Sequence, residues 1–186
     1  MATVTLRPDA NISVQCSQYP TSGYNYDKVN EVTSDGDSTY VYAPGGTNAY
    51  YYDLYDIPSS GIPVGSTINS VAITIVVRSA GYGTKSTNVA TRLNTHATIY
   101  ETSYIIANSS TYSAKTTTYT TNPYTGAAWT LDEVNSMDIG VMCRDIYLEP
   151  YDSGARCTQV YVVIDYTPPT AVAKKTMGDG LTWIMS

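Results

Sequence analysis

Histidine, phenylalanine and charged side chains are scarce in this 186-residue chain. The shortages of histidine and of charge exclude several classes of function. The chain has 1 histidine, His96, and 0 phenylalanines, and charged residues make up only 14% of it, against about a quarter in an average protein. A single histidine argues against a histidine-ligated zinc site, and a Ser-His-Asp or Cys-His catalytic site would have to use it. No G-x-S-x-G motif accompanies it. We therefore interpret His96 as a surface residue on the polar face of a strand.

Basic residues are too few for nucleic-acid binding. The chain has 10 Lys and Arg against 16 Asp and Glu, a formal net charge of −6, and no basic run. Binding to DNA or RNA requires side chains that neutralise phosphates, so we expect no nucleic acid as a partner. No apolar run reaches the roughly 20 residues of a membrane-spanning helix, so we expect no membrane either. The first residues lack the charged and apolar regions of a secretory signal peptide.

The cysteines Cys16, Cys143 and Cys157 are odd in number, and their spacing matches no metal motif. Cys143 and Cys157 could face each other across a hairpin. However, Cys143 is in phase with the apolar residues of its predicted strand, whereas Cys157 is out of phase with those of its own. We therefore predict free thiols.

Residues that favour strands dominate what is present. Tyrosine occurs 19 times, and threonine and serine are abundant; Thr, Val, Ile and Tyr suit a pleated, half-buried surface. The clearest strand is 70–78, where apolar residues alternate with others and mark a core-facing side: Val71, Ile73, Ile75 and Val77. A second strand is predicted at 89–100. Because a polar, glycine-containing segment joins them, we interpret the pair as a long hairpin.

The C-terminal half predicts a second hairpin and one short helix. A strand at 156–166, with Val160, Val162 and Ile164 inward, is expected to pair with a strand at 137–147. Thr130 and Glu133 form a capping box, which predicts a short helix. Shorter strands are expected at 3–7, 13–16, 39–42, 50–54, 103–107 and 112–120.

Many short strands, with turn signals about every ten residues, predict an all-β protein. The expected architecture is an antiparallel, jelly-roll-like β-sandwich with one short helix and a C-terminal tail. Residues 1–167 would form the sandwich domain. Residues 168–186 would form an arm, because Pro168 and Pro169 cannot continue a strand ladder.

The arm is too short to fold alone, and its apolar residues Leu181, Trp183 and Ile184 need cover. One interpretation is that they dock on a neighbouring subunit, for example as an added strand. The other is that the arm packs on its own domain or moves freely.

A cluster of tyrosines offers a second contact element. In a strand, Tyr50 and Tyr52 point to one side and Tyr51 to the other, so both faces carry aromatic rings. Tyrosine gives a rigid surface with a polar tip, which suits sugar stacking or a protein interface. Alternatively, one set packs in the core in place of phenylalanine. The interface candidates are Tyr50, Tyr51, Tyr52, Tyr55, Leu181, Trp183 and Ile184.

Three acidic pairs could serve glycoside hydrolysis: Asp132 with Glu133, Asp35 with Asp37, and Asp53 with Asp56. Each has a simpler role; Asp132 and Glu133, for instance, suit the first turn of a helix. We therefore expect no enzyme. Asp35 and Asp37 flank a glycine in a turn, and they are the only calcium candidates because oxygen-rich loops suit that ion. No other cofactor is expected.

Several stretches of sequence form a familiar set: 25–31, 35–41, 52–57, 68–71, 121–130 (TNPYTGAAWT) and 155–162. Together they resemble a widespread group of jelly-roll-like β-sandwich proteins found in tailed phages and prophages and as modules of prokaryotic surface proteins. The resemblance spans about residues 6–166. It implies the sandwich fold and no known active site, and no catalytic residue carries over. It does not fix the role, because function lies in sites and not in folds.

Two classes of function follow. The leading hypothesis is a non-enzymatic viral structural protein in the virion, such as a phage capsid decoration protein or a head or tail fibre component. It would assemble with itself, for example as a trimer, and with a major capsid or tail protein. The alternative is a carbohydrate-binding or adhesive module that contacts cell-surface glycans, or an extracellular filament subunit. The absent signal peptide, low charge and apolar arm favour the first, and the tyrosines favour the second.

Overall fold

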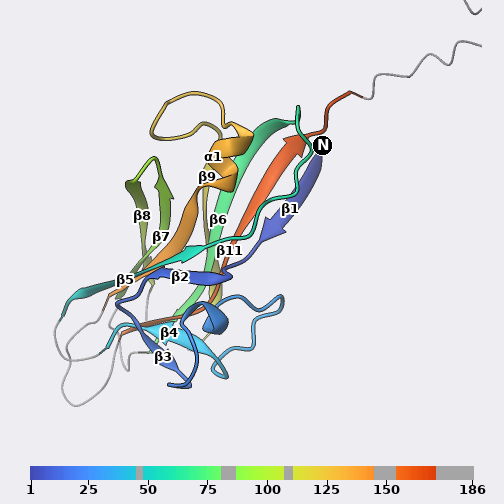
Figure 1. Ribbon diagram of the computed structural model, residues 1–186. Helices are drawn as coiled ribbons and strands as arrows, with labels where there is room; N and C mark the ends of the chain where they lie inside the picture. Colours follow the sequence, from blue (N-terminus) through green and yellow to red (C-terminus); the bar gives the residue numbers. More distant parts are fainter. Residues whose placement is uncertain (45–47, 81–86, 107–110, 145–153, 171–186) are drawn as a thin grey trace, which may run out of the picture.

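A computed structural model describes residues 1–44, 48–80, 87–106, 111–144 and 154–170, and it confirms an all-β sandwich (Figure 1). In chain order the elements are β1 (Ala2–Leu6), β2 (Ala10–Ser13), β3 (Ser17–Tyr19), the 3-10 helix η1 (Tyr26–Lys28), β4 (Tyr40–Tyr42), β5 (Tyr50–Asp56), β6 (Thr67–Ser79), β7 (Thr87–Thr95), β8 (Thr98–Ile106), β9 (Ser113–Tyr119), α1 (Leu131–Asn135), β10 (Asp138–Arg144) and β11 (Ala155–Thr167).

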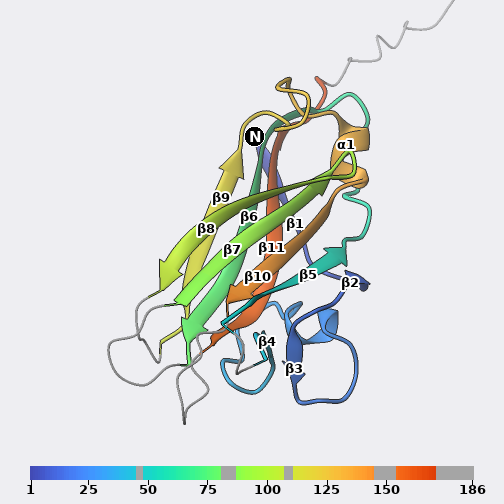
Figure 2. The ribbon, with the colours of Figure 1, turned by 90° about the vertical axis from the view of Figure 1, so that its left-hand side faces the viewer.

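The strands form two antiparallel sheets. The six-stranded sheet has the order β3-β4-β11-β6-β9, with β1 also paired to β11, and the five-stranded sheet has the order β2-β5-β10-β7-β8. Figure 2 shows β5, β10, β7 and β8 lying in front of β6, β11 and β1. Helix α1 lies at one end of the sandwich and β3, β4 and η1 at the other.

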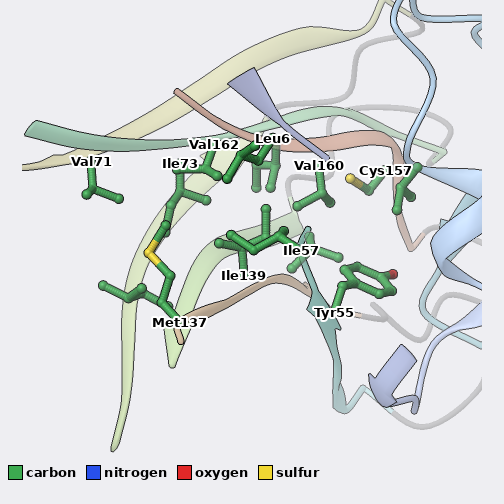
Figure 3. Close-up of a cluster of buried hydrophobic side chains, with 14 of the residues drawn as sticks. Leu6, Tyr55, Ile57, Val71, Ile73, Met137, Ile139, Cys157, Val160 and Val162 are labelled. Atoms are coloured by element: carbon green, nitrogen blue, oxygen red, sulfur yellow. The ribbon is translucent and has the colours of Figure 1, made fainter. Parts of the chain in front are cut away.

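The core lies between the sheets and follows the alternation of the strands. The inward residues of β6 are fully buried, as predicted: Val71, Ile73, Ile75 and Val77. Figure 3 shows Ile73, Val160 and Val162 of one sheet facing Ile139 and Tyr55 of the other. Burial of such apolar side chains stabilises the fold by roughly 1.5–3 kcal/mol each.

The predicted hairpin between 70–78 and 89–100 is wrong. β6 pairs with β9 and β11, whereas β7 lies in the other sheet between β10 and β8. The predicted second strand also ends early, because His96 and Ala97 adopt positive φ angles of 53° and 56° and reverse the chain into β8. Such two-residue turns usually contain Asn or Gly, so the sequence carried no turn signal here. His96 is therefore a turn residue.

The predicted hairpin between 137–147 and 156–166 is also wrong. β10 lies between β5 and β7, while β11 pairs with β6, β1 and β4 in the opposite sheet. The strand expected at 13–16 does not form either, because β2 ends at Ser13 and β3 begins at Ser17. Both hairpin errors share a cause: alternation identifies a strand and its buried side, but it does not identify the partner strand.

The three cysteines are free, as predicted, and all three are buried, including Cys157, which the alternation had placed out of phase with the core. A bulge between Cys157 and Gln159 shifts the phase of β11, and this shift lets Cys157 and Val160 both lie in the core. A hydrogen bond with the Cys143 thiol, followed by burial, raises the pKa of the Cys16 thiol well above its usual range.

The short helix α1 confirms the capping-box prediction. The Thr130 Oγ1 accepts a hydrogen bond from the Glu133 N–H at 3.2 Å, and the Glu133 Oε2 accepts one from the Thr130 N–H at 2.8 Å. Val134 is its buried residue. Among the described residues, no helix is long and apolar enough to cross a membrane.

Candidate ligand-binding face

The tyrosines of β5 divide between its two sides. Tyr50 is 43% exposed, and Tyr52 shares its side of the strand. Tyr55 is fully buried, so its prediction as an interface residue is wrong. Tyr51 is on the inward side and only partly buried, and it packs against the core, as the alternative of one tyrosine set in the core expects. The remaining candidates, Leu181, Trp183 and Ile184, lie outside the described residues.

The inner side of β5 is fixed by a buried carboxylate, Asp53, which is 0% exposed. Its Oδ1 accepts hydrogen bonds from the backbone N–H groups of Gln15 and Cys16, both at 2.9 Å. Its Oδ2 accepts from the Asn25 Nδ2 at 2.7 Å and the Tyr55 hydroxyl at 2.8 Å. A buried charge is tolerated only with such partners, so this network ties the segment before β3 and the start of η1 to β5.

The Asp53 network was not predicted from the sequence. Its one signal is a carboxylate between aromatic residues in a strand, and three of its four donors come from distant positions. Burial, followed by the charge of Asp53, raises the pKa of Tyr55 well above its usual value. Because Asp53 points into the core, it cannot act with Asp56 as an acidic pair at the surface.

On the outer side of β5, the tyrosine rings lie beneath arginines. The register places Arg144 of β10 opposite Tyr50, and its guanidinium carbon lies 5.1 Å from the centre of that ring. The guanidinium carbon of Arg92, on β7, lies 4.4 Å from the centre of the Tyr52 ring. The Arg92 Nε also contacts the Glu101 Oε1 at 2.7 Å. We call these five residues the tyrosine–arginine face.

Apolar residues lie beneath these long side chains. Met142 stands between Tyr52 and Ala90 in the register of the outer side. It is only 3% exposed, and Ala90 is fully buried, so their neighbours on the face cover them. The next outward residue of β10 is Gly140, where an added Cβ would collide with the Asp53 carbonyl oxygen. Glycine therefore allows β10 to approach β5 closely.

Polar groups extend the face toward α1. The Asn94 Nδ2 donates to the Asp138 Oδ2 at 2.7 Å. Burial raises the pKa of Asp138, the charge of Asp56 adds to the rise, and the Asn94 hydrogen bond opposes it. The face thus combines aromatic surface, guanidinium donors and carboxylate acceptors, the chemical groups that hydrogen-bond and stack on sugars.

The pairing of arginine with tyrosine extends over the whole molecule. All five arginines of the chain lie over tyrosine rings: Arg7 over Tyr161, Arg78 over Tyr112, Arg92 over Tyr52, Arg144 over Tyr50 and Arg156 over Tyr40. Significant contacts of this kind occur about once per 70–80 residues in proteins, so the chain is rich in them. Arginine therefore restrains these five tyrosine rings.

The structure does not support calcium binding by Asp35 and Asp37. The Asp37 carboxylate binds Arg78 at 2.8 Å and Arg156 at 3.3 Å. Burial pushes the pKa of Asp37 up, but hydrogen bonds from Arg78 and Tyr112 outweigh it and leave the pKa below its usual value. Asp35 instead accepts from Thr39 at 2.8 Å and Thr158 at 3.1 Å. In the part of the chain that is described, no three His, Cys, Asp or Glu side chains gather to hold a metal.

His96 joins the turn after β7 to helix α1. Its Nε2 lies 2.9 Å from the Glu133 Oε1, and the Tyr124 ring stacks on the imidazole with centres 4.6 Å apart. Glu133 also caps α1. These contacts give His96 and Glu133 a structural role at this end of the sandwich.

No family model and no curated protein matches the chain. Among solved structures, it is similar to an arabinose-bound MgGH51 α-L-arabinofuranosidase at 12% identity and a TM-score of 0.45, covering 86% of this chain and 23% of that one. It is also similar to the enzymatically active domain of bacteriophage CBA120 tailspike protein 4, at 13% identity and a TM-score of 0.42, covering 86% of this chain and 19% of that one.

A third similar structure is the family 11 carbohydrate-binding module from Clostridium thermocellum in complex with a β-1,3-1,4-mixed-linked tetrasaccharide. The identity is 13%, the TM-score is 0.38, and the match covers 86% of this chain and 95% of that one. The chain spans less than a quarter of the length of the first two structures. Likenesses at this level assign no function.

Proposed function

We propose that this chain is a non-enzymatic module that binds neutral glycans through the tyrosine–arginine face. The observation that supports it is the placement of Tyr50 and Tyr52 on the outer side of β5, each beneath an arginine. Alternate residues of a strand stand about 7 Å apart on one side, so the two rings offer adjacent contacts along one strand. A sugar would present apolar C–H surface to the parts of these rings that the arginines leave uncovered, and hydroxyl groups to the polar side chains around them.

The arginines prepare the face for this ligand. A guanidinium over a ring restrains the tyrosine, and the contact with Glu101 orients Arg92 in turn. Side chains already ordered in the free protein lose less entropy when a ligand binds. Arg92 and Arg144 also bring N–H donors close to the rings, where a sugar hydroxyl could accept them.

The test is retention on neutral polysaccharides by affinity electrophoresis, across a panel of glucans, xylans, arabinans and galactans. We expect Tyr50→Ala and Tyr52→Ala each to weaken retention at least about tenfold. A nucleobase stacked on an aromatic side chain contributes about 1–3 kcal/mol, and we take a similar value for a sugar on a tyrosine ring. The matched control is Tyr161→Ala, which removes a tyrosine beneath an arginine, Arg7, on the other sheet.

Retention that persists in both β5 variants, or that falls equally in Tyr161→Ala, would contradict the proposal. So would a wild-type protein that no polysaccharide of the panel retains.

We further propose that the module belongs to a virion, as a capsid decoration protein or a head or tail fibre component, with a cell surface as the alternative location. β11 ends at the exposed Thr167, and residues 168–170 after it are exposed as well, which is the exit expected of an arm that leaves its domain. The arm would join copies of this chain, for example in a trimer, and attach them to a major capsid or tail protein.

The assembly part is tested by size-exclusion chromatography with light scattering on the full chain and on a chain truncated after Pro169. We expect a trimer or larger assembly that the truncation reduces. The same mass for both forms would contradict an assembly role for the arm.

A further inference from the structure

A pocket of about 110 Å³ lies on the other sheet, where β4 and the ends of β6 and β11 meet. Its walls are Tyr40, Tyr42 and Arg156, and its remaining lining consists of small residues such as Ala43 and Gly154. The tyrosine–arginine face belongs to the five-stranded sheet, so this pocket is a separate site.

The aromatic wall of the pocket is held in place from several sides. The Tyr19 ring stacks on the Tyr40 ring with centres 5.2 Å apart. The Tyr42 ring also contacts the Tyr40 ring, with an angle of 59° between the two ring planes. The guanidinium carbon of Arg156 lies 4.6 Å from the centre of the same Tyr40 ring. Tyr40 is consequently only 8% exposed, while the half-buried Tyr42 also lines the pocket.

Arg156 has hydrogen-bonding capacity to spare. It shares Asp37 with Arg78, but Arg78 makes the short contacts, from Nη2 to both carboxylate oxygens at 2.8 Å. Arg156 donates to Asp37 only from Nη1, at 3.3 Å. Within the described part of the chain, its other N–H groups have no hydrogen-bond acceptor. The Arg156 side chain is 27% exposed, so these donors are accessible.

A guanidinium with free N–H groups suits one chemical class of ligand. It is always charged, and its planar fork matches the two oxygens of a carboxylate. The size of the pocket is restrictive, since a cavity of about 150 Å³ holds a benzene-sized molecule. A carboxylate and the adjoining part of a sugar ring therefore fit, with the rest of the sugar at the mouth.

We propose that this pocket binds the carboxylate of an acidic sugar such as a hexuronic acid, with Arg156 on the carboxylate and Tyr42 against the ring. Small residues keep the space open. A Cβ at Gly154, for example, would lie 3.1 Å from the Ala43 carbonyl oxygen. The proposal does not rest on glycan binding at the tyrosine–arginine face, because the ligand is charged and the site lies on the other sheet.

The test is an NMR titration of the full chain with methyl β-D-glucuronide, methyl β-D-glucoside and acetate. We expect the glucuronide to shift signals around the pocket, the glucoside to leave them unchanged, and acetate to bind at least tenfold more weakly. Arg156→Gln should weaken glucuronide binding at least tenfold. Arg78→Gln is the matched control, because it alters the same ion-pair network outside the pocket and should keep binding within twofold.

Two further variants keep the result decisive. Arg156→Lys retains the positive charge but lacks the planar guanidinium, so it tests the role of the guanidinium even if Arg156→Gln fails to fold. We expect this variant to bind the glucuronide about fivefold more weakly than the wild type. Tyr52→Ala should bind the glucuronide as the wild type does, which separates this site from the other face.

Absence of glucuronide binding to the wild type would overturn the proposal. Equal weakening in Arg156→Gln and Arg78→Gln would overturn the role of Arg156, because it would reflect only the loss of the shared network. Acetate binding as tight as that of the glucuronide would overturn the sugar in favour of a bare carboxylate.

Discussion

The two sides of β5 use different parts of the same side chain. On the inner side, the Tyr55 hydroxyl donates to the buried Asp53 and its ring packs in the core. On the outer side, the Tyr50 and Tyr52 rings lie beneath arginines. The partner of each tyrosine determines which part of its side chain is used. The buried carboxylate accepts a hydrogen bond from a tyrosine hydroxyl, whereas the guanidinium groups on the outer side lie over tyrosine rings. Tyrosine alone therefore marks neither a core nor a binding surface in this chain.

If this contrast is correct, removal of the inner carboxylate should have the largest effect on stability. Asp53→Ala leaves the Tyr55 hydroxyl, the Asn25 amide and the N–H groups of Gln15 and Cys16 without their acceptor. Each buried donor left without an acceptor costs about 1–3 kcal/mol, so with four donors affected we expect a loss of at least about 3 kcal/mol. Urea unfolding followed by circular dichroism measures this. A loss below about 1 kcal/mol would show that the network matters no more than a surface contact.

The inner and outer hydroxyls should differ in a matched pair on the same strand. Tyr55→Phe removes one buried donor to Asp53 and should cost about 1–2 kcal/mol. Tyr50→Phe removes a hydroxyl from an exposed side chain and should change stability by less than about 0.5 kcal/mol. The same urea measurement compares them. Equal losses would mean that the two sides of β5 do not differ as described.

The sequence predicted the parts of the fold that depend on local patterns. The alternation of Val71 to Val77 located β6 and its inner side, and the Thr130 and Glu133 capping box located α1. Strand pairing was not predictable in the same way, since β10 and β11 carry equally apolar alternation and their partners come from distant segments. The turn at His96 was missed because its residues lack the usual composition for positive φ angles.

The candidate site was predictable only in part. Alternation separated Tyr50 and Tyr52 from Tyr51, but it did not tell which set faces the core. Asp53 decides this, because its side is buried and it lies on the same side as Tyr51. A charged residue on the inner side inverts the usual expectation from hydrophobicity. Its burial depends on donors at Gln15, Cys16 and Asn25 that no local pattern connects to β5.

Removal of the charge of an exposed carboxylate, Asp37, should have the smallest effect on stability and should contrast most clearly with removal of Asp53. The Asp37 side chain is 52% exposed, so Asp37→Asn should cost less than about 1 kcal/mol at neutral pH. Because its pKa is lowered in the folded state, the ionised form favours folding. That contribution is complete above the unfolded pKa of about 3.9, and it is lost as the pH falls through the folded pKa.

The difference in unfolding free energy between the wild type and Asp37→Asn should therefore shrink between pH 7 and pH 3. It should also shrink at pH 7 when about 0.5 M salt screens the exposed pairs with Arg78 and Arg156. The Asp53→Ala difference should change little with salt, because Asp53 is buried and bound by neutral donors. If the Asp37→Asn loss stayed constant at pH 3 and in salt, ion pairing would not be its source. The outer carboxylate would then behave as the inner one does, and the partner would no longer explain the difference between the two.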